Sequence, residues 1–342
     1  MAGPGEPVYV TVSALDAGHL TLPERLFVTD ADPDKRSTVP SLSFLIQHPS
    51  SPASRPQRSV TNLVFDLGVK RDITGYTPAQ QEHIAQRQPV TTDPDCAASL
   101  RYGAGGSTDS GKVLLDPQRD IDVVILSHVH WDHVGTPSDF GSAAFAVGSG
   151  TLDLLARGAG PLYPAELFNA DEIPASRTVE FPAVPRRAAG YTEPQHTPAA
   201  PDALARLPAS ARHWSWKPLA DAFPSTLDFF GDGSLLIIDT PGHLYGHVNL
   251  LARVAEHRYV YLGGDCCHDP RILRGERGIA EYDDGRGGTR SVHVHTAEAR
   301  RALDDIAKFV KARGGRDQVE VVVAHDGEWR ERNRTRFWPG RL

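Results

Sequence analysis

Six residues near the middle of the chain, His128-Val-His130-Trp-Asp132-His133, constrain its fold and chemistry more than any other stretch. They follow Ile121–Ser127, an apolar run typical of a buried strand. In extended backbone His128 and His130 point to the same side, and a turn after the strand can bring Asp132 and His133 beside them. Three imidazoles and a carboxylate at a strand end indicate a site for zinc or a similar metal. The alternative is a chance cluster of histidines on a loop.

Three further apolar strands each lead into a histidine or an aspartate. The pairs are Leu235–Asp239 with His243, Tyr259–Leu262 with Asp265, and Val319–Val323 with His325. Taken alone, a histidine after a strand is more often structural than a metal ligand. Four strands that deliver such residues at the same end predict one metal site assembled from distant parts of the chain.

The pattern of apolar residues predicts a layered α/β protein in which many strands alternate with a few helices. The expected strands are Val8–Ala14, Ser43–His48, Asn62–Asp66, Ile121–Ser127, Ala143–Val147, Thr226–Phe230, Ser234–Asp239, Asn249–Val254, Arg258–Leu262 and Val319–Ala324. The expected helices are Pro78–Gln86, a helix that starts at Pro117 behind Asp116 as its N-cap, and Ala297–Ala312 with Thr296 as its N-cap.

A length of 342 residues is compatible with two domains, but the motifs favour a single domain over residues 1–342 that two insertions lengthen. The segment 102–112 is rich in glycine and serine, which predicts a mobile loop. The segment 161–218 holds ten of the 27 prolines, which predicts irregular structure without long helices or central strands. This second segment is either a linker or a lid over a pocket.

Charge and composition exclude several classes of protein. Lys and Arg number 36 against 43 Asp and Glu, so the net charge is −7, and the absence of a basic block disfavours a nucleic-acid partner. The sequence contains no run of about 18 apolar residues, so it predicts no membrane span. The first residues do not resemble a signal peptide. Three cysteines, of which Cys266 and Cys267 are adjacent, favour a reducing, cytoplasmic compartment.

Together these motifs resemble the metallo-β-lactamase superfamily. The resemblance rests on the motif at 128–133, on Thr240-Pro-Gly-His243, on Gly264-Asp265 and on His325, with Phe65-Asp66-Leu-Gly68 as an early strand-turn element. The segments Ala14–His19, Leu22–Leu26 and Phe44–Ile46 are similar to the N-acyl-homoserine-lactone lactonase branch and its fungal relatives. The resemblance implies an αββα sandwich, with two facing sheets, helices outside and the site at the edge of the sheets.

Carried over residue by residue, the resemblance implies two metal ions, expected to be zinc. One ion would be held by His128, His130 and His243, the other by Asp132, His133 and His325, and Asp265 would bridge both. A hydroxide between the metals would then be the nucleophile, and the residual positive charge would stabilise an anionic transition state. Asp66 either orients a ligand imidazole or only forms a turn. His247 is expected to support the site rather than to bind a metal.

The sequence departs from the lactonase branch three residues after the bridging aspartate, where that branch commonly has a tyrosine and this chain has His268. His268 could donate a proton to a leaving group, or Tyr245 could supply a phenol instead. The alternative is that His268 only packs beside the metals. Cys266 and Cys267 are expected to be small buried side chains. His293-Val-His295 is expected to be a solvent-facing strand end.

The stretch 271–290 contains five arginines and follows the bridging aspartate closely. They are Arg271, Arg274, Arg277, Arg286 and Arg290. A solvated loop is the ordinary interpretation, and recognition of an anion is the alternative.

The sequence thus predicts a dinuclear zinc hydrolase that opens a lactone or related ester of a small acyl compound, with quorum quenching as one role. The alternatives are a metal-dependent thioesterase acting on an acyl-carrier or glutathione thioester, and a metal-binding protein without turnover. The expected partner is a small ester or lactone, with no nucleic acid and no membrane, and the sequence predicts no oligomeric state.

Overall fold

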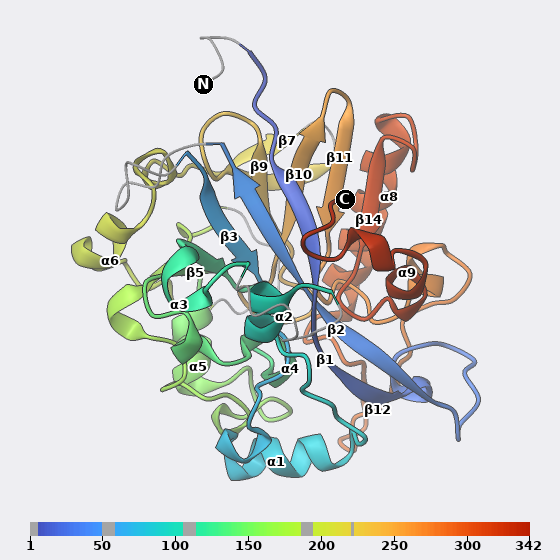
Figure 1. Cartoon of the computed structure of the whole chain (residues 1–342). Coiled ribbons are helices and arrows are strands. Elements are labelled where there is room, and N and C mark those ends of the chain that lie inside the picture. The colour runs from blue at the N-terminus through green and yellow to red at the C-terminus, as the bar shows by residue number, and fades with distance from the viewer. Residues whose placement is uncertain (1–5, 50–58, 105–113, 186–193, 220–221) are drawn as a thin grey trace.

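The computed structural model describes residues 6–49, 59–104, 114–185, 194–219 and 222–342. Two six-stranded sheets form its centre (Figure 1). In spatial order the first sheet contains β1 (Thr11–Pro23), β2 (Arg36–His48), β3 (Thr61–Phe65), β4 (Val123–Ile125), β5 (Ala144–Val147) and β6 (Thr178–Glu180). The second contains β14 (Val319–Val322), β11 (Arg258–Leu262), β10 (Val248–Ala255), β9 (Leu235–Asp239), β8 (Phe223–Asp228) and β7 (Lys217–Leu219).

Helices and a small hairpin complete the described part of the chain. The helices are α1 (Pro78–Ala85), α2 (Cys96–Tyr102), α3 (Pro117–Asp120), α4 (Trp131–Val134), α5 (Thr151–Arg157), α6 (Pro201–Arg206), α7 (Pro270–Leu273), α8 (Thr296–Ala312) and α9 (Gly327–Arg332). The hairpin consists of β12 (Tyr282–Asp283) and β13 (Thr289–Arg290). Among the described residues no helix is both long and apolar enough to cross a bilayer.

The alternation of side chains along the strands places one core between the sheets and one on each outer face. Phe65, Ile125, Ile237, Leu250 and Leu262 are buried in the inner core. Their chain neighbours point the other way. Val64 and Val124 pack with Leu100 of α2 and Leu154 of α5, whereas Ile238, Leu251 and Tyr261 pack with Ile306 and Phe309 of α8. The layers are therefore helix, sheet, sheet and helix, which is the predicted αββα sandwich.

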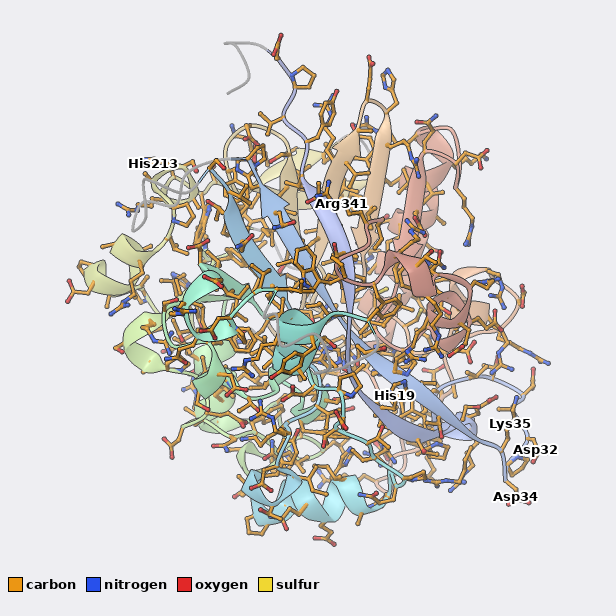
Figure 2. All side chains as sticks on the ribbon, viewed as in Figure 1. His19, Asp32, Asp34, Lys35, His213 and Arg341 are labelled. Atoms are coloured by element: carbon orange, nitrogen blue, oxygen red, sulfur yellow. The ribbon has the colours of Figure 1, made fainter. Side chains whose placement is uncertain are left out.

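The ten expected strands all form, but their ends differ from the prediction. Each of β1 and β2 has 13 residues and pairs with the other over its whole length. The two strands extend as a hairpin whose tip carries Asp32, Asp34 and Lys35 (Figure 2). The sequence did not predict this extension, because it continues through proline and charged residues. The short strands β6, β7, β12 and β13 were also missed.

The helix predictions are correct in place and partly wrong in capping. Asp116 is the N-cap of α3, as predicted. Thr296 is the first residue of α8 rather than its cap, since His295 occupies the N-cap position without a side-chain bond to the helix. The exposed face of α8 is polar while Ile306 and Phe309 are buried, and burying such a side chain contributes about 1.5–3 kcal/mol.

The two expected insertions have different outcomes. Residues 105–113, most of the segment expected to be a mobile loop, lie outside the described residues. The proline-rich segment, where described, contains short elements: β6 is an edge strand of the first sheet, β7 is an edge strand of the second, and α6 has six residues. Edge positions suit proline because an edge strand leaves one side of its backbone without ladder hydrogen bonds.

Candidate metal centre and substrate pocket

The motif 128–133 lies where β4 leaves the first sheet. The chain passes from the strand through His128 to His130, which is the N-cap of the short helix α4. Asp132 and His133 lie on that helix, so the turn brings them back beside the strand end. Gly135 then ends α4 at a φ of 58°, and a Cβ at this position would lie 2.5 Å from the carbonyl oxygen of Leu67. Only glycine fits this turn, which fixes the path of the motif.

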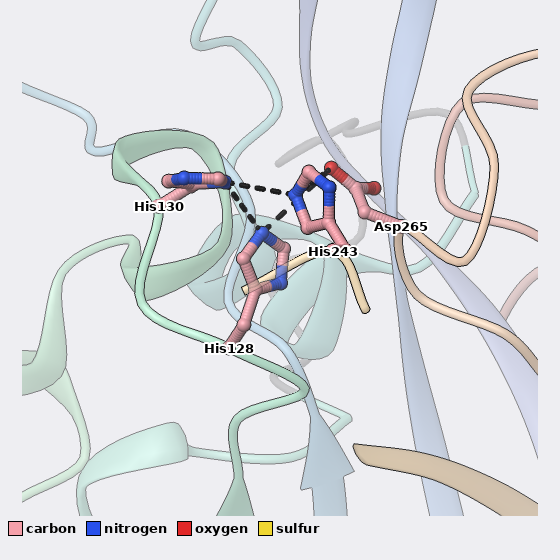
Figure 3. Close-up of side chains that lie close together, drawn as sticks. All are labelled: His128, His130, His243 and Asp265. Atoms are coloured by element: carbon pink, nitrogen blue, oxygen red, sulfur yellow. Dashed lines mark hydrogen bonds and ion pairs between the residues drawn. The ribbon is translucent and has the colours of Figure 1, made fainter. Parts of the chain in front are cut away.

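One group of candidate ligands joins the two halves of the chain (Figure 3). The Nε2 atoms of His128 and His243 lie 2.9 and 3.0 Å from Nδ1 of His130. Asp265 Oδ2 lies 3.4 Å from His243 Nε2 and 3.7 Å from His128 Nε2. One ligand atom of each of these four residues lies within 4.8 Å of the others. Nitrogen atoms that converge in this way fit a shared cation.

A second group adjoins the first through Asp265. It contains Asp132, His133 and His325. Nε2 of His133 and Nε2 of His325 each lie 3.2 Å from Asp265 Oδ1. These three atoms are buried and have no hydrogen-bond partner among the described residues. Buried polar atoms in such a position indicate an ion that the protein would hold. Imidazole nitrogen and carboxylate oxygen are donors that zinc accepts readily, so the residues fit two metal ions sharing one carboxylate.

The electrostatics of the cluster favour neutral imidazoles at several ligands. Burial is the main cause that holds the pKa of His128 and His243 well below the usual range, and the positive charge of neighbouring imidazoles is the second. Burial lowers the pKa of His130 to about 4. Burial alone would raise the pKa of Asp265, but the charges of surrounding histidines hold it well below its usual value. Neutral imidazole and ionised carboxylate are the forms that bind metals.

The second nitrogen of several candidate ligands is held by a neighbour. Asp66 Oδ2 accepts from His133 Nδ1 at 2.9 Å and from Ser127 Oγ at 2.7 Å, while its Oδ1 accepts from Ser127 N–H at 2.6 Å. The carbonyl of Pro40 accepts from His325 Nδ1 at 2.8 Å. Asp66 has a φ of 59°, so it forms the turn as well as orienting the imidazole. Asp66 therefore forms the turn and also contacts the imidazole of His133.

His247 supports the site from behind, as expected. Its Nε2 accepts a hydrogen bond from the backbone N–H of Asp265 at 3.1 Å, and its Nδ1 lies 2.9 Å from Thr240 Oγ1. Both ring nitrogens are thus engaged, and the ring fixes the backbone that carries Asp265. Cys266 and Cys267 are buried free thiols.

The two candidate proton donors occupy different places. His268 Nε2 lies 3.0 Å from Asp265 Oδ2, and the ring contacts Phe27 at a centroid distance of 4.8 Å. Its Nδ1 is buried without a hydrogen-bond partner among the residues that the structure describes. The hydroxyl of Tyr245 lies 3.3 Å from His295 Nε2, and Tyr245 is not among the described residues that line the pocket beside the cluster. The structure brings His268 to the site and leaves Tyr245 outside its lining.

His293 was missed, and the expectation of a solvent-facing strand end is wrong. The residue is 3% exposed, and its Nδ1 lies 3.1 Å from Nδ1 of His243. Backbone hydrogen bonds from Val294 N–H to His243 and from His295 N–H to Gly242 hold the segment against the ligand loop. The pattern His293-Val-His295 was the only signal in the sequence for this role. His243, which His293 contacts, lies 50 residues earlier in the chain.

A cavity of about 310 Å³ opens beside the cluster. Its apolar lining comprises Leu20, Leu22, Leu26, Phe27, Trp131, Leu162, Leu167, Phe168 and Val292. The proline-rich segment contributes several of these side chains and Tyr163, whose hydroxyl donates to the carbonyl of Val292 at 3.1 Å. This segment thus forms a wall of the pocket rather than only a linker.

Comparison with known sequences shows the family to which the chain belongs. The model of the Metallo-beta-lactamase superfamily matches residues 102–148. Gamma-lactamase MBL2 of Gibberella moniliformis is 31% identical over 211 residues, which cover 60% of this chain and 70% of that protein. Metallo-hydrolase mfmC of Annulohypoxylon moriforme is 30% identical over 239 residues, which cover 69% of this chain and 50% of the relative. The chain belongs to the metallo-β-lactamase superfamily.

A third relative is much longer than this chain. Cytochrome P450 monooxygenase mpaDE' of Penicillium brevicompactum is 26% identical over 347 residues, covering 97% of this chain but 35% of the relative. The chain thus spans 35% of the length of mpaDE' and 50% of the length of mfmC.

Solved structures show the same fold at low sequence identity. An N-acyl homoserine lactone hydrolase with the product N-hexanoyl-L-homoserine at its catalytic metal centre matches with a TM-score of 0.59 and 13% identity, over 98% of this chain and all (100%) of that one. A quorum-quenching N-acyl homoserine lactone lactonase matches with a TM-score of 0.58 and 14% identity, over 98% and 99% of the two chains.

Proposed function

We propose that this protein is a dinuclear zinc-dependent hydrolase that opens a lactone or a related ester of a small acyl compound. The observation that carries the proposal is the position of Asp265, whose two carboxylate oxygens face two different groups of histidines. The cavity beside it is the size of a small ligand site, and its lining combines apolar side chains such as Phe27 and Phe168 with polar and charged ones. The three free, buried cysteines favour the cytoplasm as its location.

The residues divide into two ligand sets in this proposal. His128, His130 and His243 would hold one zinc ion, Asp132, His133 and His325 the other, and Asp265 both. When bound, the two ions would polarise the substrate carbonyl and lower the pKa of a water molecule toward neutrality. Asp66, His247 and the Pro40 carbonyl keep the ligands in place. The apolar wall around Phe27 and Phe168 excludes bulk water, which strengthens these electrostatic interactions.

His268 is the proposed proton donor to the leaving alkoxide. It lines the cavity, lies 3.0 Å from Asp265, and keeps Nδ1 free of any hydrogen bond with the described residues. We assign this role to His268 rather than to Tyr245, because the Tyr245 hydroxyl faces His295. Replacing His268 by Phe keeps a ring against Phe27 and removes the proton, so kcat should fall about a hundredfold or more while zinc remains bound.

The test combines metal analysis with a substrate panel. The purified protein should contain two zinc ions per chain, lose ring-opening activity on chelation and regain it with added zinc. The panel contains acyl-homoserine lactones, simple γ-lactones, γ-lactams and acyl thioesters. Opening of the homoserine lactones would indicate a quorum-quenching role, and preferential thioester cleavage would favour the thioesterase. Full activity in the metal-free protein would overturn the proposal. His213→Phe is the matched control for His268→Phe, because His213 (labelled in Figure 2) is exposed and belongs neither to the candidate ligand groups nor to the described cavity lining.

A further inference from the structure

Arg87 is a buried cation beside the candidate metal centre. The residue follows α1, and two hydrogen bonds fix its backbone. The Arg87 N–H donates to the carbonyl of Ile84 at 2.8 Å, and the carbonyl of Arg87 accepts from the N–H of Thr21 at 2.9 Å. Its side chain lines the cavity, is 8% exposed, and lies over the ring of Phe27 at 5.8 Å. Within the described part of the chain, the guanidinium has no ion pair and no hydrogen-bond partner.

Arg290 is a second cation in the same lining, contributed by β13. Its guanidinium lies over the ring of Tyr282 at 5.2 Å, and its Nε is buried with no hydrogen-bond partner in the described part of the chain. The hairpin β12–β13 that carries it belongs to the arginine-rich stretch 271–290. Other arginines of the stretch are paired: Arg271 with Glu24 and Asp269, and Arg274 with Glu276.

The two arginines approach the same part of the cavity. Burial raises the pKa of the Tyr282 phenol, while the charges of Arg290 and Arg87 both act to lower it, so both cations lie within electrostatic reach of one hydroxyl. We define the arginine wall as Arg87, Tyr282 and Arg290. His83, also in the lining, is neutral at pH 7, because burial and then the charge of Arg87 lower its pKa to about 4.

No described residue forms an ion pair with either guanidinium of this wall. The carboxylate of Asp132 acts on Arg87 only through a longer-range charge interaction, as Asp284 does on Arg290. The carboxylates among the described lining residues are Asp132 and Asp265, and both face the histidine cluster as candidate metal ligands. Buried charges are normally paired, because taking them from water costs free energy that only an opposite charge restores. An anion from outside the protein is the partner that would satisfy both guanidinium groups.

We propose that the arginine wall is an anion subsite, and that the substrate is a lactone or ester whose acyl part carries a free carboxylate. This inference rests on the proposed hydrolase function and narrows its substrate class. Arginine suits the role, because its planar guanidinium can donate two parallel hydrogen bonds to one carboxylate. The carboxylate would lie against Arg87 and Arg290 and the apolar part against Phe27 and Phe168, while the scissile carbonyl faces Asp265. A cavity of about 310 Å³ restricts this to a small molecule.

The experiment compares two substrates that differ only in charge. One is a γ-lactone with a carboxymethyl side chain, and the other is the same lactone with a carboxamidomethyl side chain. The wild-type zinc enzyme should prefer the carboxylate in kcat/KM. Arg87→Gln and Arg290→Gln should each lower kcat/KM for the carboxylate about tenfold to a hundredfold, chiefly through KM, and change the neutral lactone little. Arg300→Gln, which breaks an exposed ion pair with Glu281, is the control.

Two results separate the failure of this inference from failure of the hydrolase proposal. Turnover of both lactones without a preference for the carboxylate, or a preference that survives both arginine substitutions, would overturn the anion subsite alone. If neither lactone is opened, calorimetric binding of phenylacetate against phenylacetamide to the zinc-loaded protein decides. Phenylacetate affinity that falls in Arg87→Gln and Arg290→Gln supports the subsite, and affinity that is unchanged in both variants rejects it.

Discussion

Two parts of the site are built differently. One part, which we call the metal-ligand wall, lies at the ends of strands and is braced by further hydrogen bonds. It comprises the proposed ligands His128, His130, Asp132, His133, His243, Asp265 and His325. The arginine wall comes from the segment after α1 and from a two-residue hairpin strand, and its guanidinium groups make no ion pairs with described residues. Rigid strand ends suit chemistry that needs fixed geometry, whereas connecting segments can change between relatives and set selectivity. The predictions below test whether the walls have these separate roles.

The largest effect is expected on the metal-ligand wall at Asp265. Asp265→Ala removes the carboxylate that both proposed ligand sets share, whose Oδ1 lies 3.2 Å from Nε2 of His133 and of His325. Zinc content should fall below two per chain, and kcat/KM should fall about a thousandfold or more. Metal analysis and lactone kinetics measure both. Asp305→Ala, at a half-buried aspartate of α8 that pairs with the exposed Lys308, is the control, and wild-type rates in Asp265→Ala would refute the bridging role.

A smaller effect is expected one contact farther out, at Asp66. Asp66→Asn replaces one carboxylate oxygen by an amide NH₂ group. That group can only donate hydrogen bonds, whereas the carboxylate accepts them from His133 and Ser127. His133 then loses its orientation, and zinc affinity should fall about tenfold to a hundredfold. Competition with a chromogenic chelator measures the affinity, and excess zinc should restore most of the activity. Unchanged zinc affinity would show that Asp66 only forms the turn.

His293 tests the corresponding contact that the sequence did not reveal. His293→Leu removes the group that holds Nδ1 of His243, so zinc affinity should fall about tenfold. His293→Gln offers an oxygen in a similar position and should restore part of that loss, which a purely steric role would not. The spectrum of the cobalt-substituted protein gives a readout independent of turnover. Identical spectra in His293→Leu and the wild type would exclude the positioning role.

The smallest effect is expected behind the cavity, at Glu24. Burial would raise its pKa, but hydrogen bonds from Arg271, Ser37 and Lys35 lower it to about 2. A carboxylate with a lowered folded-state pKa stabilises the fold above its ordinary pKa of 4.5, and that contribution is lost as the pH falls from 4.5 toward 2. Glu24→Gln should therefore lower Tm at pH 6 and flatten its dependence on pH below 4.5.

Calorimetric scans from pH 6 down to pH 2.5 measure this difference, and Glu281→Gln on the surface is the control. An equal slope in Glu24→Gln and the wild type would contradict the assignment. Leu26 and Phe27, which follow Glu24, line the cavity. The metal content should be unchanged in Glu24→Gln, because Glu24 belongs to neither wall and pairs with Arg271 and Lys35.

Some parts of this architecture were predictable because they obey local rules. The strands could be found from apolar runs, and the motif 128–133 from the spacing of its ligands. Asp66 was identified because it follows a strand at a turn. His293 was misassigned, since its contact with His243 depends on backbone bonds between segments distant in the chain. The anion alternative for 271–290 was open in the sequence, but nothing local distinguished Arg290 from the paired Arg271.

The sequence by itself determined which side chains could bind metal and that they follow strands, because strand periodicity and ligand chemistry are local properties. Tertiary structure alone decided that Asp265 faces both histidine groups, that His268 rather than Tyr245 lines the cavity, and that Arg87 and Arg290 share one wall. These depend on how the two sheets pack and on which loops meet at their common edge. The burial of Arg87, the half-burial of Arg290 and the lack of an ion pair with any described carboxylate make these two arginines a candidate anion site. These properties arise only when the chain is folded.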